Sequence, residues 1–357
     1  MNVLNVAYNF NTGGVERLII DVSNELAKQN VSTYLCIINN SYTQSLLDSI
    51  DDRVVIFHLK KIGKNYKLGY LKQLIHIIKQ NKIDVVHIHQ GNLIKFFSLV
   101  KLACPGTKYY YTLHDTRIFF ELSKLDRFLI KVKCNKIIAI SDAVRKDALA
   151  GGIPENKVQR IYNGVNFDRF KIAEHNSEQI TICNVARFIP HKKGQDLLIE
   201  AVKILKTNGK NIRCYFAGAP ISTEDSEYQQ ILSKIREYGL EENVFLLGNV
   251  SDVPSLLAKA DVFVVPSRFE GFGIVAVEAA AAGIPCVASN IDGLAEVVND
   301  KRLGRLFEVG NAEALAQAID SVVSNISDFN PNWIRENAYN RFSIQVMTSA
   351  LLNVYKG

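Results

Sequence analysis

Short apolar runs rich in β-branched residues alternate along this chain with longer stretches of helical periodicity, in two successive blocks. This order predicts parallel strands, because a crossover between parallel strands needs about a dozen or more residues, usually as a helix. A length of 357 residues exceeds what one core usually holds, so we expect two α/β domains. The strands are expected near residues 2–8, 31–38, 54–58, 85–89, 108–113, 136–140 and 158–161, and then near 180–185, 213–217, 244–247, 262–265, 286–288 and 304–306.

Helical spacing between these strands predicts the connecting helices. In the second block it begins at Gln195, and an Ala-rich helix is expected over residues 274–282, before Gly283 and Pro285. Residues 170–178 are polar and unpatterned, which is typical of a linker. In the first block the helices are expected near residues 15–29, 68–80, 93–103, 122–133 and 142–150.

Composition excludes several classes of protein. A hydrophobic content of 48% is ordinary for a globular chain, and no uncharged apolar run is long enough to cross a bilayer. The N-terminus starts on an apolar strand without a basic leader, so a cytoplasmic protein is expected. The cysteines are scattered without C-x-x-C pairs, which favours buried thiols in a reducing compartment. They are Cys36, Cys104, Cys134, Cys183, Cys214 and Cys286.

Two carboxylates flank a glycine turn in segment 268–278, which follows an apolar strand. Gly271 and Gly273 allow a ligand to approach the backbone, and the first turn of the following helix favours an anion such as a diphosphate. Glu270 precedes this helix and Glu278 lies within it, so one carboxylate can meet sugar hydroxyls and the other ribose hydroxyls. A solvent-exposed helix face is the alternative interpretation of this spacing.

A basic segment follows the strand expected at 180–185. Arg187, Lys192 and Lys193 are expected on the loop between that strand and the helix from Gln195, at the strand's carboxyl end, where open α/β sheets bind ligands. Arg187 and Lys193 are candidates to stabilise the negative charge of a departing nucleoside diphosphate. Taken alone, the same residues fit a solvated basic loop.

Together these segments resemble glycosyltransferase family four, also called glycosyl transferases group one. Ala186 and Asp292 depart from the family pattern, since each stands where glycine is common, and Asp292 leaves the local turn open. The resemblance is carried by segments 13–16, 84–89, 112–115, 138–141 and 161–165, by Glu270 and Glu278 with seven residues between them, and by 293–298.

The resemblance implies the GT-B fold: two Rossmann-like parallel-sheet domains facing a central cleft. Residues 1–168 would bind the acceptor, residues 169–340 the nucleotide sugar, and the helix in 341–357 would cross back to the first domain. The implied reaction is retaining, hexosyltransferase-type transfer from a nucleoside diphosphate sugar, with UDP expected, to a glycan or lipid-linked acceptor in envelope polysaccharide, lipopolysaccharide or glycolipid synthesis. No cofactor is implied, and since the chain has no Asp-x-Asp, no metal is expected.

The histidines differ in their expected roles. His87 is expected to pack and His89 to line the cleft, whereas the resemblance places His114 beside the donor sugar. The catalytic candidates are therefore Glu270, Arg187, Lys193 and His114. The candidates for donor binding are Gly13, Gly14, Asn163, Asn249, Val250, Gly271, Phe272, Gly273, Ile274, Val275 and Glu278.

Charge is concentrated in the first block. Residues 1–170 hold 24 Lys and Arg against 14 Asp and Glu, net +10, whereas residues 171–357 hold 18 against 22, net −4. Within 117–136, the apolar residues Leu125, Phe128, Leu129 and Val132 follow helical spacing, and Lys124, Arg127 and Lys131 lie on another face. A helix that covers its own sheet is the simpler interpretation, and a helix on an anionic membrane surface is the alternative.

Nucleic acid is not an expected partner, because no nucleic-acid-binding module accompanies the basic block. Two further functions stay open from the residues: a sugar-nucleotide epimerase of the same fold, and a non-catalytic module that binds nucleotide sugars.

Overall fold

The computed structural model describes residues 1–61, 68–90, 93–173, 179–220 and 222–357. The chain forms two compact units: unit 1 comprises Met1–Gly164 and Ile344–Gly357, and unit 2 comprises Val165–Ser343. The N–H of Val165, the first residue of unit 2, donates to the carbonyl of Phe342, near the end of that unit, at 2.9 Å. Residues 174–178 of the expected linker lie outside the described residues.

Unit 1 is built on a seven-stranded parallel sheet in the order β3-β2-β1-β4-β5-β6-β7. The central strands are apolar and buried on both faces, as a sheet covered by helices on both sides requires. The strands are β1 Asn2–Ala7, β2 Ser32–Asn39, β3 Val55–Lys61, β4 Val85–Ile88, β5 Lys108–Leu113, β6 Lys136–Ala139 and β7 Val158–Arg160.

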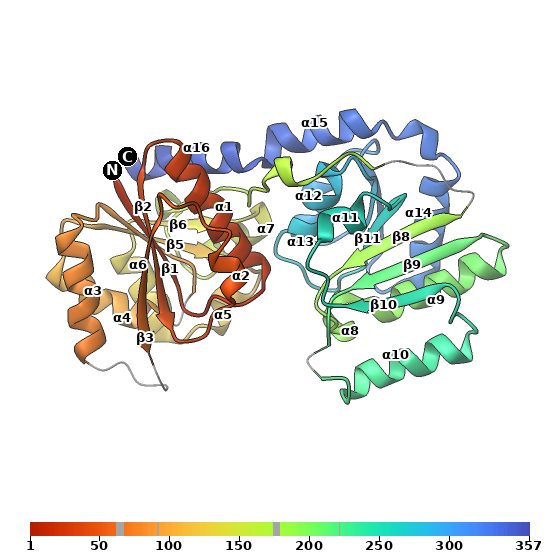
Figure 1. The fold of residues 1–357 in the computed structure, drawn as a ribbon, viewed down its shortest axis with the longest axis horizontal. Helices are drawn as coiled ribbons and strands as arrows, with labels where there is room; N and C mark the ends of the chain where they lie inside the picture. The colour runs from red at the N-terminus through yellow and green to blue at the C-terminus, as the bar shows by residue number, and fades with distance from the viewer. Residues whose placement is uncertain (62–67, 91–92, 174–178, 221) are drawn as a thin grey trace. The chain divides into compact units, whose positions relative to one another are not determined.

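The helices of unit 1 cover both faces of this sheet (Figure 1). α3, α4 and α6 lie side by side on one face, and α1 and α16 pack together on the other, as right-handed crossovers require for strands on opposite sides of β1 and β4. The helices are α1 Gly14–Lys28, α2 Gln44–Leu47, α3 Leu68–Gln80, α4 Ile94–Ala103, α5 Ile118–Glu121, α6 Lys124–Lys133, α7 Asp142–Ala150 and α16 Ile344–Lys356.

The helix expected over 122–133 begins two residues later than predicted. Leu122 is extended, and the Ser123 hydroxyl accepts from the Asp126 N–H as an N-cap, which starts α6 at Lys124.

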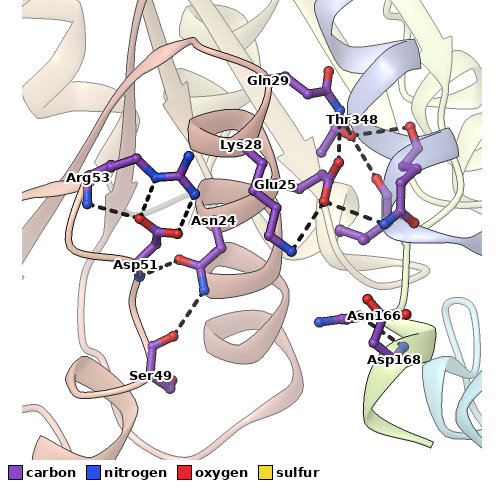
Figure 2. Close-up of polar contacts among 12 residues, drawn as sticks. Asn24, Glu25, Lys28, Gln29, Ser49, Asp51, Arg53, Asn166, Asp168 and Thr348 are labelled. Carbon is purple, nitrogen blue, oxygen red and sulfur yellow. Dashed lines mark hydrogen bonds and ion pairs between the residues drawn. The ribbon is translucent and has the colours of Figure 1, made fainter.

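α16 is the last element of the chain and packs on α1, the first helix (Figure 2). The Gln29 amide donates to Glu25 at 3.0 Å and to the Thr348 hydroxyl at 3.3 Å. At the other end of α16, the Tyr355 hydroxyl lies 2.6 Å from His87 Nδ1. The C-terminal helix is therefore part of the core of unit 1.

Unit 2 is built on a six-stranded parallel sheet in the order β10-β9-β8-β11-β12-β13. The strands are β8 Ile180–Val185, β9 Ile212–Ala217, β10 Val244–Gly248, β11 Val262–Val265, β12 Cys286–Ser289 and β13 Gly304–Phe307. Together with unit 1, this sheet confirms the predicted fold class of two Rossmann-like parallel-sheet domains.

In unit 2, α9 packs with α14 and α12 packs with α15 (Figure 1). Strand order reverses between β8 and β11, and ligands of open α/β sheets bind where the order reverses, outside the carboxyl ends of the strands. The helices are α8 Pro190–Lys193, α9 Gln195–Thr207, α10 Ser226–Glu237, α11 Val253–Leu257, α12 Ile274–Ala281, α13 Asp292–Val297, α14 Ala312–Val323 and α15 Pro331–Phe342.

All six cysteines are buried and unpaired, which confirms the predicted buried thiols. Burial raises the pKa of the Cys36, Cys134 and Cys183 thiols to about 12. Within the described ranges, every helix is too short or too polar to cross a membrane.

Candidate functional site

The loops after β8 and β11 are tied together at the point where strand order reverses in unit 2. Gly194 has a left-handed φ of 72°, and a Cβ at this position would lie 2.0 Å from the Pro266 carbonyl oxygen. The Arg268 N–H donates to the Lys192 carbonyl at 2.9 Å. The fully buried Gln195 donates from its side-chain amide to the Arg187 carbonyl at 3.0 Å. Backbone contact thus fixes the basic segment against the segment that contains Glu270.

Lys192 and Lys193 were expected on a loop, and this prediction was wrong. They lie on the short helix α8, which Pro190 begins and the left-handed Gly194 ends. Four residues carry too little periodicity for the sequence to reveal such a helix. Arg187 remains on the loop before α8, where its side chain is exposed and forms no ion pair with the described residues.

Lys193, the last residue of α8, and Glu270, on the loop after β11, form an ion pair. Lys193 Nζ lies 2.6 Å from Glu270 Oε2, and each side chain is 18% exposed. An ammonium has three donors, so Lys193 can retain Glu270 while it contacts a further anion. The structure therefore brings the predicted phosphate-binding cation and the predicted sugar-binding carboxylate into direct contact.

Arg268, on the loop after β11, and Asp196, in the first turn of α9, form a second ion pair, and neither residue was assigned a role from the sequence. The Arg268 guanidinium donates to both Asp196 carboxylate oxygens, at 2.8 and 2.7 Å, and to the Pro190 carbonyl at 2.9 Å. The hydrogen bonds to Asp196 raise the pKa of Arg268 above its ordinary value. A bidentate pair of this kind is rigid, so it holds α8 beside the 268–273 turn. In the sequence, the opposite charges of Arg268 and Asp196 are the only indication of this contact.

The turn before α12 approaches α13 at van der Waals distance. Gly273 is the left-handed N-cap of α12, with φ 87°, and no side chain caps the helix. A Cβ on Gly293 would lie 2.4 Å from Phe272 Cα, so only glycine allows this approach. Asp292 has φ 39°, which explains why glycine is common there and why an aspartate is tolerated.

The remaining candidates of unit 2 surround this turn or lie on a neighbouring strand end. Gly271 and Phe272 are buried, whereas Ile274, Val275 and Glu278 on α12 are half-buried. Asn249 and Val250 follow β10, two strands from β8, and Asn249 is exposed.

Three histidines cluster at the carboxyl ends of β4 and β5 in unit 1. His87 packs in the core, as predicted, with Nδ1 and Nε2 each 2.6 Å from a hydroxyl, of Tyr355 and Thr112 respectively. His89 is only 4% exposed, and its Nδ1 lies 3.1 Å from His114 Nε2. Burial lowers the pKa of His87 to about 3 and of His114 to about 4, so the rings are neutral near pH 7.

The hydrogen bond between His89 and His114 couples their tautomers. Two neutral imidazoles share one proton at this contact, so one outer nitrogen carries N–H and the other a lone pair. His89 Nε2 and His114 Nδ1 are these outer atoms, and both are buried without a hydrogen-bond partner among the described residues. A hydroxyl can satisfy either, since it donates and accepts.

The other candidates of unit 1 lie at strand ends. Gly13 caps α1 and Gly14 begins it, after β1. Asn163 is buried, and its Oδ1 has no partner among the described residues, which leaves an acceptor available to a ligand. Among those residues, no group of three or more His, Cys, Asp or Glu could hold a metal ion.

α6 covers one face of the sheet beside α4, as the simpler interpretation of segment 117–136 expects, but not through its apolar stripe. Ile130 and Asp126 are the buried residues of α6, whereas Leu125, Phe128 and Val132 are exposed. The helix therefore packs through the side next to the stripe, where Leu129, a member of the stripe, is half-buried.

Family models match both halves of the chain. The model of glycosyltransferase family 4 matches residues 12–169, and that of glycosyl transferases group 1 matches residues 166–341. An uncharacterised glycosyltransferase of Methanocaldococcus jannaschii is 30% identical over 310 residues, with 83% of this chain and 80% of the relative covered. The capsular polysaccharide biosynthesis glycosyltransferase CapM of Staphylococcus aureus is 28% identical over 330 residues, which cover 87% of this chain and 80% of CapM.

A solved structure shares the whole fold. The crystal structure of Anabaena HepE in complex with UDP and glucose has a TM-score of 0.84 and 19% identity, over 100% of both chains. The same family is indicated by the motifs at the carboxyl ends of the strands, by the two parallel sheets and by the family models. This chain belongs to glycosyltransferase family 4, the glycosyl transferases group 1, and has the GT-B fold.

Proposed function

We propose that this glycosyltransferase transfers a sugar, with retention of configuration, from a UDP-sugar to a hydroxyl of a glycan or lipid-linked acceptor. The observation that carries the proposal is the Lys193–Glu270 pair at the point of strand-order reversal, close to the N-terminus of α12. Two similar proteins support an envelope glycan and a UDP donor: CapM is a glycosyltransferase of capsular polysaccharide biosynthesis, and HepE was solved in complex with UDP and glucose.

In this proposal the diphosphate is held by fixed positive charge. Arg187 and Lys193 contact its oxygens, assisted by backbone N–H groups of Gly14 and of residues 273–275 in the first turn of α12. The backbone N–H groups are held in place by α1 and α12, so they need no reorganisation as the leaving group gains charge.

The two carboxylates divide the recognition of hydroxyls. Glu270 accepts from the sugar and Glu278 from the ribose, whereas Asn249 and Val250 lie near the base. In unit 1, His114 and Asn163 orient a hydroxyl of the sugar or the acceptor, and residues 1–164 with 344–357 are the acceptor-binding unit.

The cations lead us to propose that transfer needs no metal ion. Activity should survive EDTA after bound metal has been removed by dialysis. Complete loss in EDTA, restored by Mg²⁺ or Mn²⁺, would contradict the proposal.

A donor screen tests the function directly. Nucleotide sugars are compared by thermal shift, and the best donor is then incubated with lipid-linked and polysaccharide acceptors, with products identified by mass spectrometry. A hexose added to an acceptor supports the proposal. Donor converted without acceptor would indicate an epimerase, and binding without any product would indicate a non-catalytic module.

A further inference from the structure

Two neighbouring helices of unit 1 expose large apolar side chains in regular stripes. On α6, Leu125, Phe128 and Val132 are 54%, 58% and 44% exposed, and on α4, Leu99 and Leu102 are 54% and 69% exposed. On α6 the spacing is i, i+3, i+7, so these side chains lie on one side of the helix. We call these five residues the α4–α6 face.

The two helices that carry these side chains lie beside each other. Lys95 Nζ, at the start of α4, lies 3.3 Å from Asp126 Oδ2, at the start of α6. Lys101 Nζ, near the end of α4, donates to the carbonyl of Lys133, the last residue of α6, at 2.7 Å. The helices therefore run parallel and in contact (Figure 1). Both cover one face of the sheet, so their solvent sides form a single surface.

The apolar stripes are bordered by cations. α4 and α6 together hold six Lys and Arg against a single acidic residue, Asp126, which is buried and paired with Lys95. Lys95, Lys124 and Lys131 are exposed. Large apolar side chains that gather on an exposed surface are typical of a site that a partner covers, and a partner for this face should carry negative charge.

We propose that the α4–α6 face docks on an anionic lipid bilayer, with Leu99, Leu102, Leu125, Phe128 and Val132 among the acyl chains and the lysines at the headgroups. Buried apolar area and attraction to anionic lipid together set the strength of such binding. A second copy of this chain fits less well, because a two-fold contact would bring two lysine-bordered faces of the same charge together. The inference rests on the proposed function for its purpose, which is access to a lipid-linked acceptor, but its test needs no substrate.

The test is co-sedimentation of the full chain with vesicles of phosphatidylcholine alone and of phosphatidylcholine with phosphatidylglycerol. The wild-type protein should bind the mixed vesicles, more weakly at high salt, and hardly bind phosphatidylcholine alone. A variant with Leu125→Gln, Phe128→Gln and Val132→Gln should bind at least ~10-fold more weakly. Lys124→Glu with Lys131→Glu should also weaken binding, by roughly fivefold or more per charge changed.

Controls separate insertion from general effects. Val55→Gln with Val309→Gln changes two apolar residues, 47% and 41% exposed, that are not part of this face, and should leave binding unchanged. Circular dichroism melting checks that each variant folds, and UDP-sugar thermal shift reports the donor site separately. Phe128→Trp should shift its emission to shorter wavelength on mixed vesicles, since acyl chains replace water around the indole.

Three outcomes would overturn the proposal. They are wild-type protein that does not sediment with the mixed vesicles, an apolar triple variant that binds as well as wild type, and a wild-type dimer in sedimentation velocity that the triple variant abolishes. The last would assign the face to a second copy of the chain. A donor that fails to bind would contradict the proposed function and leave the vesicle result untouched.

Discussion

Lys193 lies on α8 and Glu270 on the loop after β11, yet their charged atoms lie 2.6 Å apart. If Lys193 stabilises the leaving diphosphate, Lys193→Ala should lower kcat by roughly 100-fold, while the fold persists because the side chain is only partly buried. Glu270→Gln should impair transfer strongly as well. Because the two residues touch, their effects in the double variant should not be additive. Steady-state kinetics of the four proteins tests this, and additive losses would mean that the pair acts as two separate contacts.

Glu278 lies half-buried on α12, inside the helix whose first turn is proposed to meet the phosphate. Glu278→Gln should weaken donor binding by roughly tenfold with little change in kcat, since ribose contacts are made equally in the ground and transition states. Isothermal titration with the donor measures the change. Unchanged affinity would remove Glu278 from the donor site.

The buried histidines make unit 1 sensitive to acid. His87 and His114 have folded-state pKa values of about 3 and about 4, below the ordinary 6.5. At a pH between the folded value and 6.5, the unfolded chain therefore binds more protons than the folded chain. The free energy of unfolding should therefore fall as pH drops below about 6.5, by about 2 kcal/mol per histidine at pH 5. His114→Asn should flatten the dependence, measured by urea unfolding at pH 5 and 7. His76→Gln, at an exposed position on α3, is the control and should not change it.

At the scale of elements, α13 and the turn before α12 depend on contact through Gly293. Gly293→Ala would place a Cβ 2.4 Å from Phe272 Cα and 2.5 Å from the Gly271 carbonyl oxygen, and backbone cannot yield as a side chain does. We expect about 1–3 kcal/mol of destabilisation and weaker donor binding, because the glycine turn must move.

Gly69→Ala is the matched control. Gly69 lies on α3 with nothing within 4 Å of the added Cβ, so helix propensity alone should act, and this change should be neutral or stabilising. Thermal unfolding and donor titration of both variants measure these effects. Equal melting temperatures and equal donor affinities for Gly293→Ala and Gly69→Ala would show that the turn tolerates displacement.

At the scale of the whole molecule, the two ends of the chain are joined in unit 1. α16 packs on α1, and Tyr355 contacts His87, so removal of residues 344–357 should expose the core of unit 1. We expect calorimetry to show a lower melting temperature for unit 1, whereas unit 2 should keep its donor-induced thermal shift because it holds none of these residues. Tyr355→Phe, which removes only the hydroxyl beside His87, should lower the melting temperature less than the truncation does. A truncated chain that melts like the full one would refute the role of α16.

The sequence by itself determined the fold class and most of the element positions. Apolar β-branched strands separated by helical stretches have few solutions other than parallel α/β sheets, since local periodicity and crossover geometry both act within short segments. For the same reason, Glu270, Glu278, Arg187, Lys193 and His114 could be nominated: strand ends and glycine turns mark the edge of a sheet where ligands bind.

Tertiary structure alone decided which side chains meet. The Lys193–Glu270 and Arg268–Asp196 pairs join segments more than seventy residues apart, with separations of 77 and 72, and no local pattern encodes such contacts. Helix α8 was too short to show periodicity. On α6, apolar spacing indicated the buried side, but the packed side is the one through Asp126 and Ile130. Hydrophobic spacing identifies an apolar stripe, and only the neighbouring elements determine whether that stripe faces the core or solvent.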